Sequence, residues 1–143
     1  CRTQNGCIGA INEGQADFHF LMLFGNETTP STAMGETWKN TMQGLASRNV
    51  ANNMSVSAAQ QFNLTDGQIH QMGALYAAIL WQIYRSPTVD KVEFEKIFLG
   101  HLQMLTGTSR FIEAREALIA QDTAHFNGKY RTIIQTAFSS RGL

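Results

Sequence analysis

The sequence has 143 residues, of which 43% are hydrophobic and 15% are charged, and its 11 basic and 11 acidic side chains give a net charge of zero. A chain of this length corresponds to about one domain, and its hydrophobic content argues against disorder. The neutral charge argues against nucleic acid or an anionic membrane as the main partner, and no apolar run reaches the roughly 18 residues of a transmembrane helix.

The first residues of the chain contain its two cysteines, Cys1 and Cys7. The pair is compatible with a small N-terminal disulfide if the protein is exported, and equally with two free thiols near a chain end. Three Asn-x-Ser/Thr triplets begin at Asn26, Asn53 and Asn63. These are acceptor sequences for N-glycosylation, which matters only for a eukaryotic protein that enters the secretory pathway. Cysteine usage alone leaves the compartment open.

The hydrophobic periodicity predicts about five main helices and one long polar loop. Residues 9–24 are expected to form the first helix, and residues 26–63, rich in Asn, Ser, Thr, Gly and Gln, a loop of a length that often carries function. The other helices are expected at 65–84, 89–106, 110–121 and 128–139. No segment alternates with period two, so the fold class is all-α, with residues 1–143 as a single helical domain.

Local signals place the helix ends and the core. Thr65, with Gln68 three residues later, has the pattern of a capping box; Gly107 is expected to end the third helix, and Ser109 to cap the fourth. The expected core positions of the last four helices are Ile69, Met72, Tyr76, Leu80, Ile83, Val92, Phe98, Leu102, Leu105, Phe111, Ala114, Leu118, Ile119, Tyr130, Ile133, Ile134, Ala137 and Phe138.

The first helix carries two carboxylates on a face that continues as core. Glu13 and Asp17 are four residues apart, and the same strip runs on to Phe20, Leu21 and Phe24. In one interpretation this face meets water for two turns and then enters the core. In the other, both acids face a site whose partners come from elsewhere, such as a metal and a histidine, because a carboxylate beside a core is costly unless it is compensated. Spacing alone does not decide between them.

Three motifs carry a resemblance to a known family. The first helix contains Gly9-Ala10-Ile11-Asn12-Glu13-x-x-Ala16-Asp17, which resembles the G-A-I-N-E-x-x-S-D helix of thermolysin-like zinc peptidases, with alanine in place of the usual serine; the Glu13-Gly14 step resembles the E-G-x-x-D form of fungalysins. The segment Ile69-His70-Gln71-Met72-Gly73-x-x-Tyr76-Ala77-x-x-Leu80-Trp81 is similar to the fungalysin pattern V-H-x-x-G-x-x-W-A-x-x-L-(Y/W). Near the end, residues 111–119 and 137–143 resemble the closing F-x-x-A-R-x-A-(I/L)-(I/L) and A-F-x-x-R-G-L packing signatures.

The resemblance implies a role for each residue that matches the family's motifs. Glu13 would be the third zinc ligand, and Asp17 would hydrogen-bond and orient a zinc-bound histidine. His70 would donate a hydrogen bond to the oxyanion formed during peptide hydrolysis. Arg48, in the long loop, would bind a substrate backbone carbonyl through its fork of donors, and Asn12 would hydrogen-bond the substrate backbone. For Arg48 and Asn12, a solvated surface side chain and a helix-capping role are the respective alternatives.

The sequence contains no His-Glu-x-x-His motif, which in the resembled families supplies two zinc ligands and the general base. We therefore expect the C-terminal helical-bundle domain of the thermolysin-like metallopeptidase fold. It would be part of a secreted or extracytoplasmic zinc metalloendopeptidase acting on peptide or protein substrates, with the other two ligands outside this chain and no activity in the isolated chain. A calcium site made by this chain alone is not expected, because residues 26–63 hold few acids. The alternatives are a natural two-chain enzyme and a metal-free pseudo-peptidase that acts as a protein-binding module.

Overall fold

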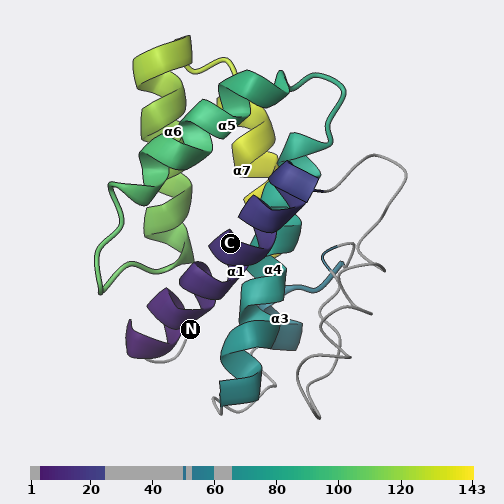
Figure 1. Cartoon of the computed structure of the whole chain (residues 1–143), viewed down its shortest axis with the longest axis vertical. Helices are drawn as coiled ribbons and strands as arrows, with labels where there is room; N and C mark the ends of the chain where they lie inside the picture. The colour runs from purple at the N-terminus through teal and green to yellow at the C-terminus, as the bar shows by residue number, and fades with distance from the viewer. Residues whose placement is uncertain (1–3, 25–49, 51–52, 60–65) are drawn as a thin grey trace.

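The computed structural model describes residues 4–24, 50, 53–59 and 66–143, and their regular structure is entirely helical (Figure 1). The helices are α1 (Gln4–Phe24), α3 (Val56–Ala59), α4 (Asp66–Tyr84), α5 (Lys91–Leu102), α6 (Phe111–Phe126) and α7 (Arg131–Ser139). This arrangement confirms the all-α fold class. No helix within these ranges is long and apolar enough to cross a membrane.

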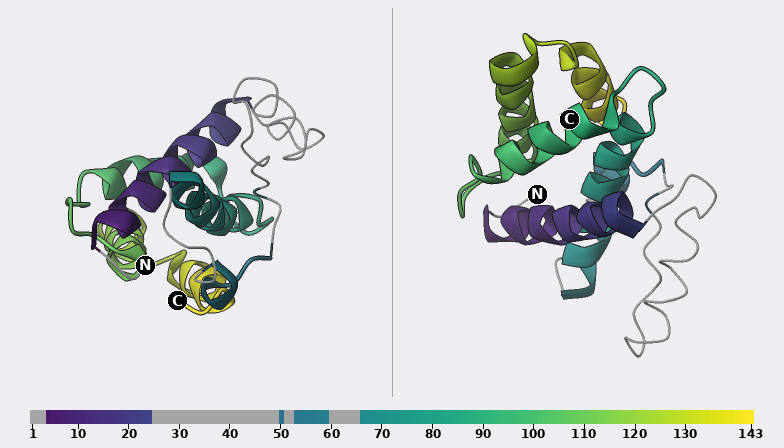
Figure 2. Two further views of the ribbon diagram at one scale, coloured as in Figure 1. Left: turned by 90° about the horizontal axis from the view of Figure 1, so that it is seen from below. Right: turned by 45° about the horizontal axis from the view of Figure 1, so that its top comes forward.

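Helix α4 forms the centre of the molecule. Every residue from Met72 to Trp81 is buried, so this helix is apolar on all sides, as expected for one that other helices surround. Helix α1 crosses α4 on one side, and α7 and the short α3 also contact it (Figure 2). Helices α5 and α6 pack against each other, and α6 continues the packing onto α7.

An aromatic cluster joins α1, α4 and α5. The ring of Phe18 lies edge-on to the rings of Tyr84, Phe94 and Phe98, at centroid distances of 5.7, 6.1 and 4.8 Å. Phe18, Phe94 and Phe98 are completely buried. Edge-to-face pairs of this kind are worth about 0.5–1.5 kcal/mol each beyond the area they bury, so Phe18 fixes the second half of α1 onto the other two helices.

A buried polar pair lies within this core. The Tyr76 hydroxyl is 3.0 Å from Nε2 of His101, and Nδ1 of His101 is hydrogen-bonded to the Phe98 carbonyl. The carbonyl can only accept, so Nδ1 carries the proton and Nε2 accepts from the tyrosine. Burial lowers the pKa of His101 to about 4 and raises that of Tyr76, so both side chains are neutral at neutral pH.

Several predicted helix ends differ from the structure. Helix α1 begins at Gln4 instead of residue 9, α5 ends at Leu102 instead of 106, α6 extends to Phe126 instead of 121, and α7 begins at Arg131 instead of 128. The extension of α6 ends at Asn127, whose φ of 55° is the left-handed conformation that commonly follows a helix. The segment 56–59, expected within the polar loop, is helical, while most of that loop and Thr65 lie outside the described residues.

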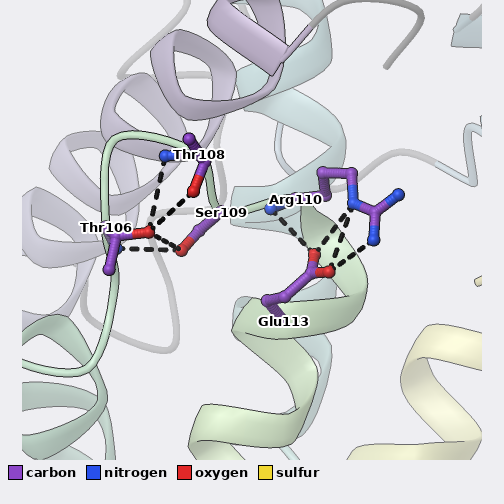
Figure 3. A network of polar contacts seen from close by, with 5 residues as sticks. All are labelled: Thr106, Thr108, Ser109, Arg110 and Glu113. Atoms are coloured by element: carbon purple, nitrogen blue, oxygen red, sulfur yellow. Dashed lines mark hydrogen bonds and ion pairs between the residues drawn. The ribbon is translucent and has the colours of Figure 1, made fainter.

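The prediction that Ser109 caps the fourth helix is wrong. The N-cap is Arg110, whose backbone N–H donates to the Glu113 carboxylate at 3.0 Å (Figure 3). The Ser109 hydroxyl instead accepts from the backbone N–H of Thr106 at 2.9 Å and closes the preceding turn. A serine beside a helix start can bond on either side of itself, so the sequence pattern alone does not distinguish a cap from a turn.

The predicted core is correct apart from one clear error. Val92, expected inside, is 75% exposed, because the buried face of α5 runs through Phe94, Ile97, Phe98 and His101. Leu102, Leu105, Ile69 and Ile133 are only partly buried. The other expected core positions of α4 to α7 are buried, although Tyr130 immediately precedes α7.

Candidate functional site

Two glycines set the distance between α1 and α4. A β-carbon added to Gly14 would lie 2.5 Å from the carbonyl oxygen of Gly73 and 2.9 Å from Cβ of Tyr76. A β-carbon added to Gly73 would lie 2.8 Å from Cβ of Glu13 and 3.1 Å from the carbonyl oxygen of Ala10. Each glycine has at least one such distance below 3.0 Å, which real β-carbons essentially never show, so the two backbones meet as closely as they do only because both positions are glycine.

This close crossing brings the Glu13 carboxylate to the imidazole of His70. Glu13 directly precedes Gly14, and His70 lies three residues before Gly73. Oε2 of Glu13 is 2.7 Å from Nδ1 of His70. Their side chains are 35% and 23% exposed, so the pair lies at the surface and not inside the core. The structure therefore brings together two residues that lie 57 positions apart in the sequence.

Asp17 lies one helical turn beyond Glu13 and is buried, with 3% of its surface exposed. The interpretation in which the first two turns of this face meet water is therefore wrong for Asp17 and holds only for Glu13. The continuation of this strip is expected to be core; Leu21 is buried there, but Phe20 is 45% exposed. The buried face of α1 consists of Cys7, Ala10, Ile11, Gly14, Asp17, Phe18 and Leu21.

The other predicted site residues are placed as follows. Asn12 is exposed beside Glu13 on α1, with its side chain accessible to a ligand. Arg48 lies outside the described residues, as does Cys1. Cys7 is buried and disulfide-bonded, while its expected pairing with Cys1 stays a prediction.

The donor set around Glu13 fits part of a metal centre. A half-exposed carboxylate is an ordinary zinc ligand, and a buried carboxylate one turn away is the kind of group that orients such ligands. A catalytic zinc takes three protein ligands, and the described part of the chain holds no group of three His, Cys, Asp or Glu side chains that could bind a metal. Glu13 would therefore need further ligands from outside these residues.

Sequence reasoning missed the importance of Gly14 and Gly73. Both glycines belong to the motifs quoted above, one directly after Glu13 and the other three residues after His70. Periodicity treats glycine only as a weak helix former and gives no sign that two helices meet there. The available signal is a glycine inside an otherwise strong helical pattern, which often has a packing reason.

Comparison with known proteins assigns the chain to a family. The model of the fungalysin metallopeptidases matches residues 2–143. The chain belongs to this family. It is 22% identical to the extracellular metalloproteinase mep of Aspergillus fumigatus over 158 aligned residues, which cover 94% of this chain and 25% of the relative. It is 23% identical, with the same coverage, to the probable extracellular metalloproteinase 2 of Arthroderma benhamiae and to extracellular metalloproteinase 2 of Trichophyton rubrum.

Membership of the fungalysin family confirms the resemblance seen in the motifs. Its members are metallopeptidases, a class of hydrolase that is zinc-dependent in general, and the matched relatives are extracellular proteins by name. This chain spans about a quarter of the length of those relatives. No solved structure matches it.

Proposed function

We propose that this chain is the C-terminal part of a secreted zinc metalloendopeptidase and contributes Glu13 and His70 to its active site. The observation that supports this most directly is the contact between Glu13 and His70, at 2.7 Å across a glycine-packed helix crossing. Both residues stand at the matching positions of the family's motifs. A rigid scaffold that holds a carboxylate and an imidazole side by side at the surface is suited to act on a bound substrate.

Glu13 would hold zinc together with two ligands from outside the described residues. When bound there, zinc would activate a water molecule for attack on a peptide carbonyl. Asp17 would accept a hydrogen bond from one of the other ligands and fix its orientation. Because the described residues supply one of the three ligands and the sequence holds no His-Glu-x-x-His motif, we expect the chain to be inactive in isolation.

His70 would stabilise the charge that develops on the peptide carbonyl oxygen. Its Nδ1 would donate to the Glu13 carboxylate, which fixes the ring orientation and points Nε2 away from Glu13; Nε2 can donate to substrate only when the ring carries a proton on both nitrogens. One such donor is worth about 3–4 kcal/mol of the barrier, or roughly 10²–10³ in turnover. Asn12, exposed beside Glu13, would bind the substrate backbone, and Arg48 would bind a substrate carbonyl.

The proposal is tested in the complete enzyme with Glu13→Ala, His70→Ala and Glu116→Gln. Glu116 is a surface carboxylate on α6, paired with Arg115 and remote from the α1–α4 crossing, so its replacement is the control. Zinc content is measured by elemental mass spectrometry, and turnover with a peptide substrate.

We expect Glu13→Ala to lose zinc and activity together. His70→Ala should keep zinc and lose roughly 10²–10³ in turnover. Full zinc content and turnover in Glu13→Ala would refute the assignment. A wild-type protein that binds no zinc would instead favour the metal-free binding module.

A further inference from the structure

The segment Asn53-Met54-Ser55 is an N-glycosylation acceptor sequence in a described part of the chain. Asn53 is exposed and lies outside any helix, three residues before the start of α3. Acceptor asparagines are surface loop residues of secreted proteins, and the relatives of this chain are extracellular proteins of fungi, which are eukaryotes. N-glycosylation requires a eukaryotic protein that enters the secretory pathway, and the relatives meet both conditions.

The backbone around Asn53 is held by the C-terminal end of the chain. Nη1 of Arg141 donates to the Met54 carbonyl at 3.2 Å, and the Arg141 carbonyl accepts from the Val56 backbone N–H at 2.8 Å. Arg141 itself is 5% exposed, so the anchor is part of the core. Within the same segment, the Ser55 hydroxyl accepts from the Ala58 N–H at 3.2 Å. These contacts fix the position from which the Asn53 side chain leaves the surface.

A pocket of about 650 Å³ opens beside Asn53, within the roughly 300–1,000 Å³ of small-molecule sites. Besides Asn53, its lining combines an indole ring, two guanidinium groups, a side-chain amide and two hydroxyls, from Trp81, Arg85, Arg141, Gln82, Ser86 and Ser140. Arg85 lies 5.9 Å from the centre of the Trp81 ring. Trp81 is only 7% exposed and stacks on Tyr84 at 5.7 Å, so the pocket offers mainly its hydrogen-bonding groups, which match the polar hydroxyls at the edge of a sugar ring.

We propose that Asn53 carries an N-linked glycan whose first N-acetylglucosamine occupies this pocket. In the reaction, the Asn53 amide nitrogen bonds to the anomeric carbon of a lipid-linked oligosaccharide, the bond from that carbon to the lipid pyrophosphate breaks, and the amide loses one proton to a base. The donor is the activated oligosaccharide of the eukaryotic secretory pathway. The inference rests on the proposed secretion of the protein and is independent of zinc.

Peptide mapping tests the modification on the full protein secreted from a yeast host. The glycans are released by an amidase in heavy-oxygen water, which converts each glycosylated asparagine to a labelled aspartate. We expect label at Asn53, loss of it in Ser55→Ala, and retention in Ser55→Thr, which keeps the acceptor sequence. Unlabelled Asn53 in the secreted wild type would overturn the proposal, whether or not Asn26 and Asn63 carry label.

Thermal unfolding tests the placement of the first sugar. In a background with Asn26→Gln and Asn63→Gln, an endoglycosidase trims the Asn53 glycan to one N-acetylglucosamine, and this protein is compared with the Asn53→Gln variant. Asn53→Gln is the reference because Ser55 supports α3, and because enzymatic removal of the whole glycan would leave an aspartate near two arginines.

We expect the single sugar to raise Tm by about 2–4 °C, and replacement of Arg85 by alanine to reduce that gain. Equal Tm values would refute the pocket assignment. Peptidase activity is measured on the same preparations, so that an occupied Asn53 in a zinc-free protein would refute only the proposed function.

Discussion

Replacing Gly14 with alanine is expected to separate α1 from α4 and damage the site without changing any residue that contacts substrate. The added β-carbon would lie 2.5 Å from the Gly73 carbonyl oxygen, whereas ordinary contact begins at 3.4 Å. The obstacle is backbone within a buried helix, so a side-chain rotation cannot relieve it. The helices must therefore move apart by about 0.9 Å, a shift that follows from those two distances.

That shift has two consequences of calculable size. Overpacking of this kind costs about 1–3 kcal/mol, and the better helix propensity of alanine returns about 1 kcal/mol, so the net loss of stability is up to about 2 kcal/mol. The contact between Glu13 and His70, now 2.7 Å, would lengthen beyond the roughly 3.2 Å limit of a good hydrogen bond. The loss of turnover should therefore exceed what the stability change alone explains.

Gly100→Ala in α5 is the matched control. The nearest atoms to a β-carbon there all belong to the Gln121 side chain, with Oε1 at 2.3 Å and Cγ at 3.2 Å, and this flexible side chain can swing away. The control should be neutral or gain up to about 1 kcal/mol from helix propensity. Thermal unfolding and turnover are measured for both variants of the zinc-loaded enzyme. A Gly14→Ala protein with wild-type Tm and turnover would show that glycine at the crossing does not set the site geometry.

Three further predictions concern buried or partly buried polar groups. The pKa of His101 is lowered from 6.5 to about 4, so between these pH values the unfolded chain binds a proton that the folded chain does not. The free energy of unfolding should therefore fall by up to about 3 kcal/mol as the pH drops from 6.5 to about 4. Urea denaturation at several pH values should show that the stability of His101→Gln depends less on pH than that of the wild type. Asp122 is buried, and both of its carboxylate oxygens accept from the Tyr130 backbone N–H. Asp122→Asn should lower the free energy of unfolding by about 1–3 kcal/mol in the same assay. A loss below about 0.5 kcal/mol would contradict a stabilising role for this carboxylate. The Tyr84 hydroxyl donates to Glu95 at 2.8 Å, and burial together with Glu95 raises the pKa of Tyr84 to about 12. The ultraviolet titration of Tyr84→Phe should therefore lack the phenol that ionises near pH 12. An unchanged amplitude at that pH would refute the assignment of this pKa to Tyr84.

Much of the fold follows from the sequence because its helices are long and strongly periodic. The stripe expected on the helix at 65–84 is buried from Met72 to Ile83, and most of the apolar positions expected in α6 and α7 are buried as well. Helix ends are less predictable, since side chains such as Ser109 can serve a turn or a cap with the same local sequence. Val92 shows a related limit, because a valine at the edge of a helical stripe reaches the core only if a neighbouring helix covers it.

The site is predictable only in part, and for a different reason. Glu13 and His70 stand out because their motifs match a family, while periodicity alone supports both a surface and a site interpretation. What brings them together is the pair of glycines, whose effect depends on a partner helix more than fifty residues away. Similarly, the pairing of His101 with Tyr76 joins residues on two helices, and no local pattern reveals it.

The direct contact between Glu13 and His70 means that their contributions to function cannot be independent. Removing the Glu13 carboxylate takes away a proposed ligand and also the group that orients His70, so part of its effect on turnover would come from the imidazole. Removing His70 leaves the carboxylate in place on the rigid crossing. Zinc content therefore separates the two roles better than activity does, because it should respond strongly to one residue and little to the other.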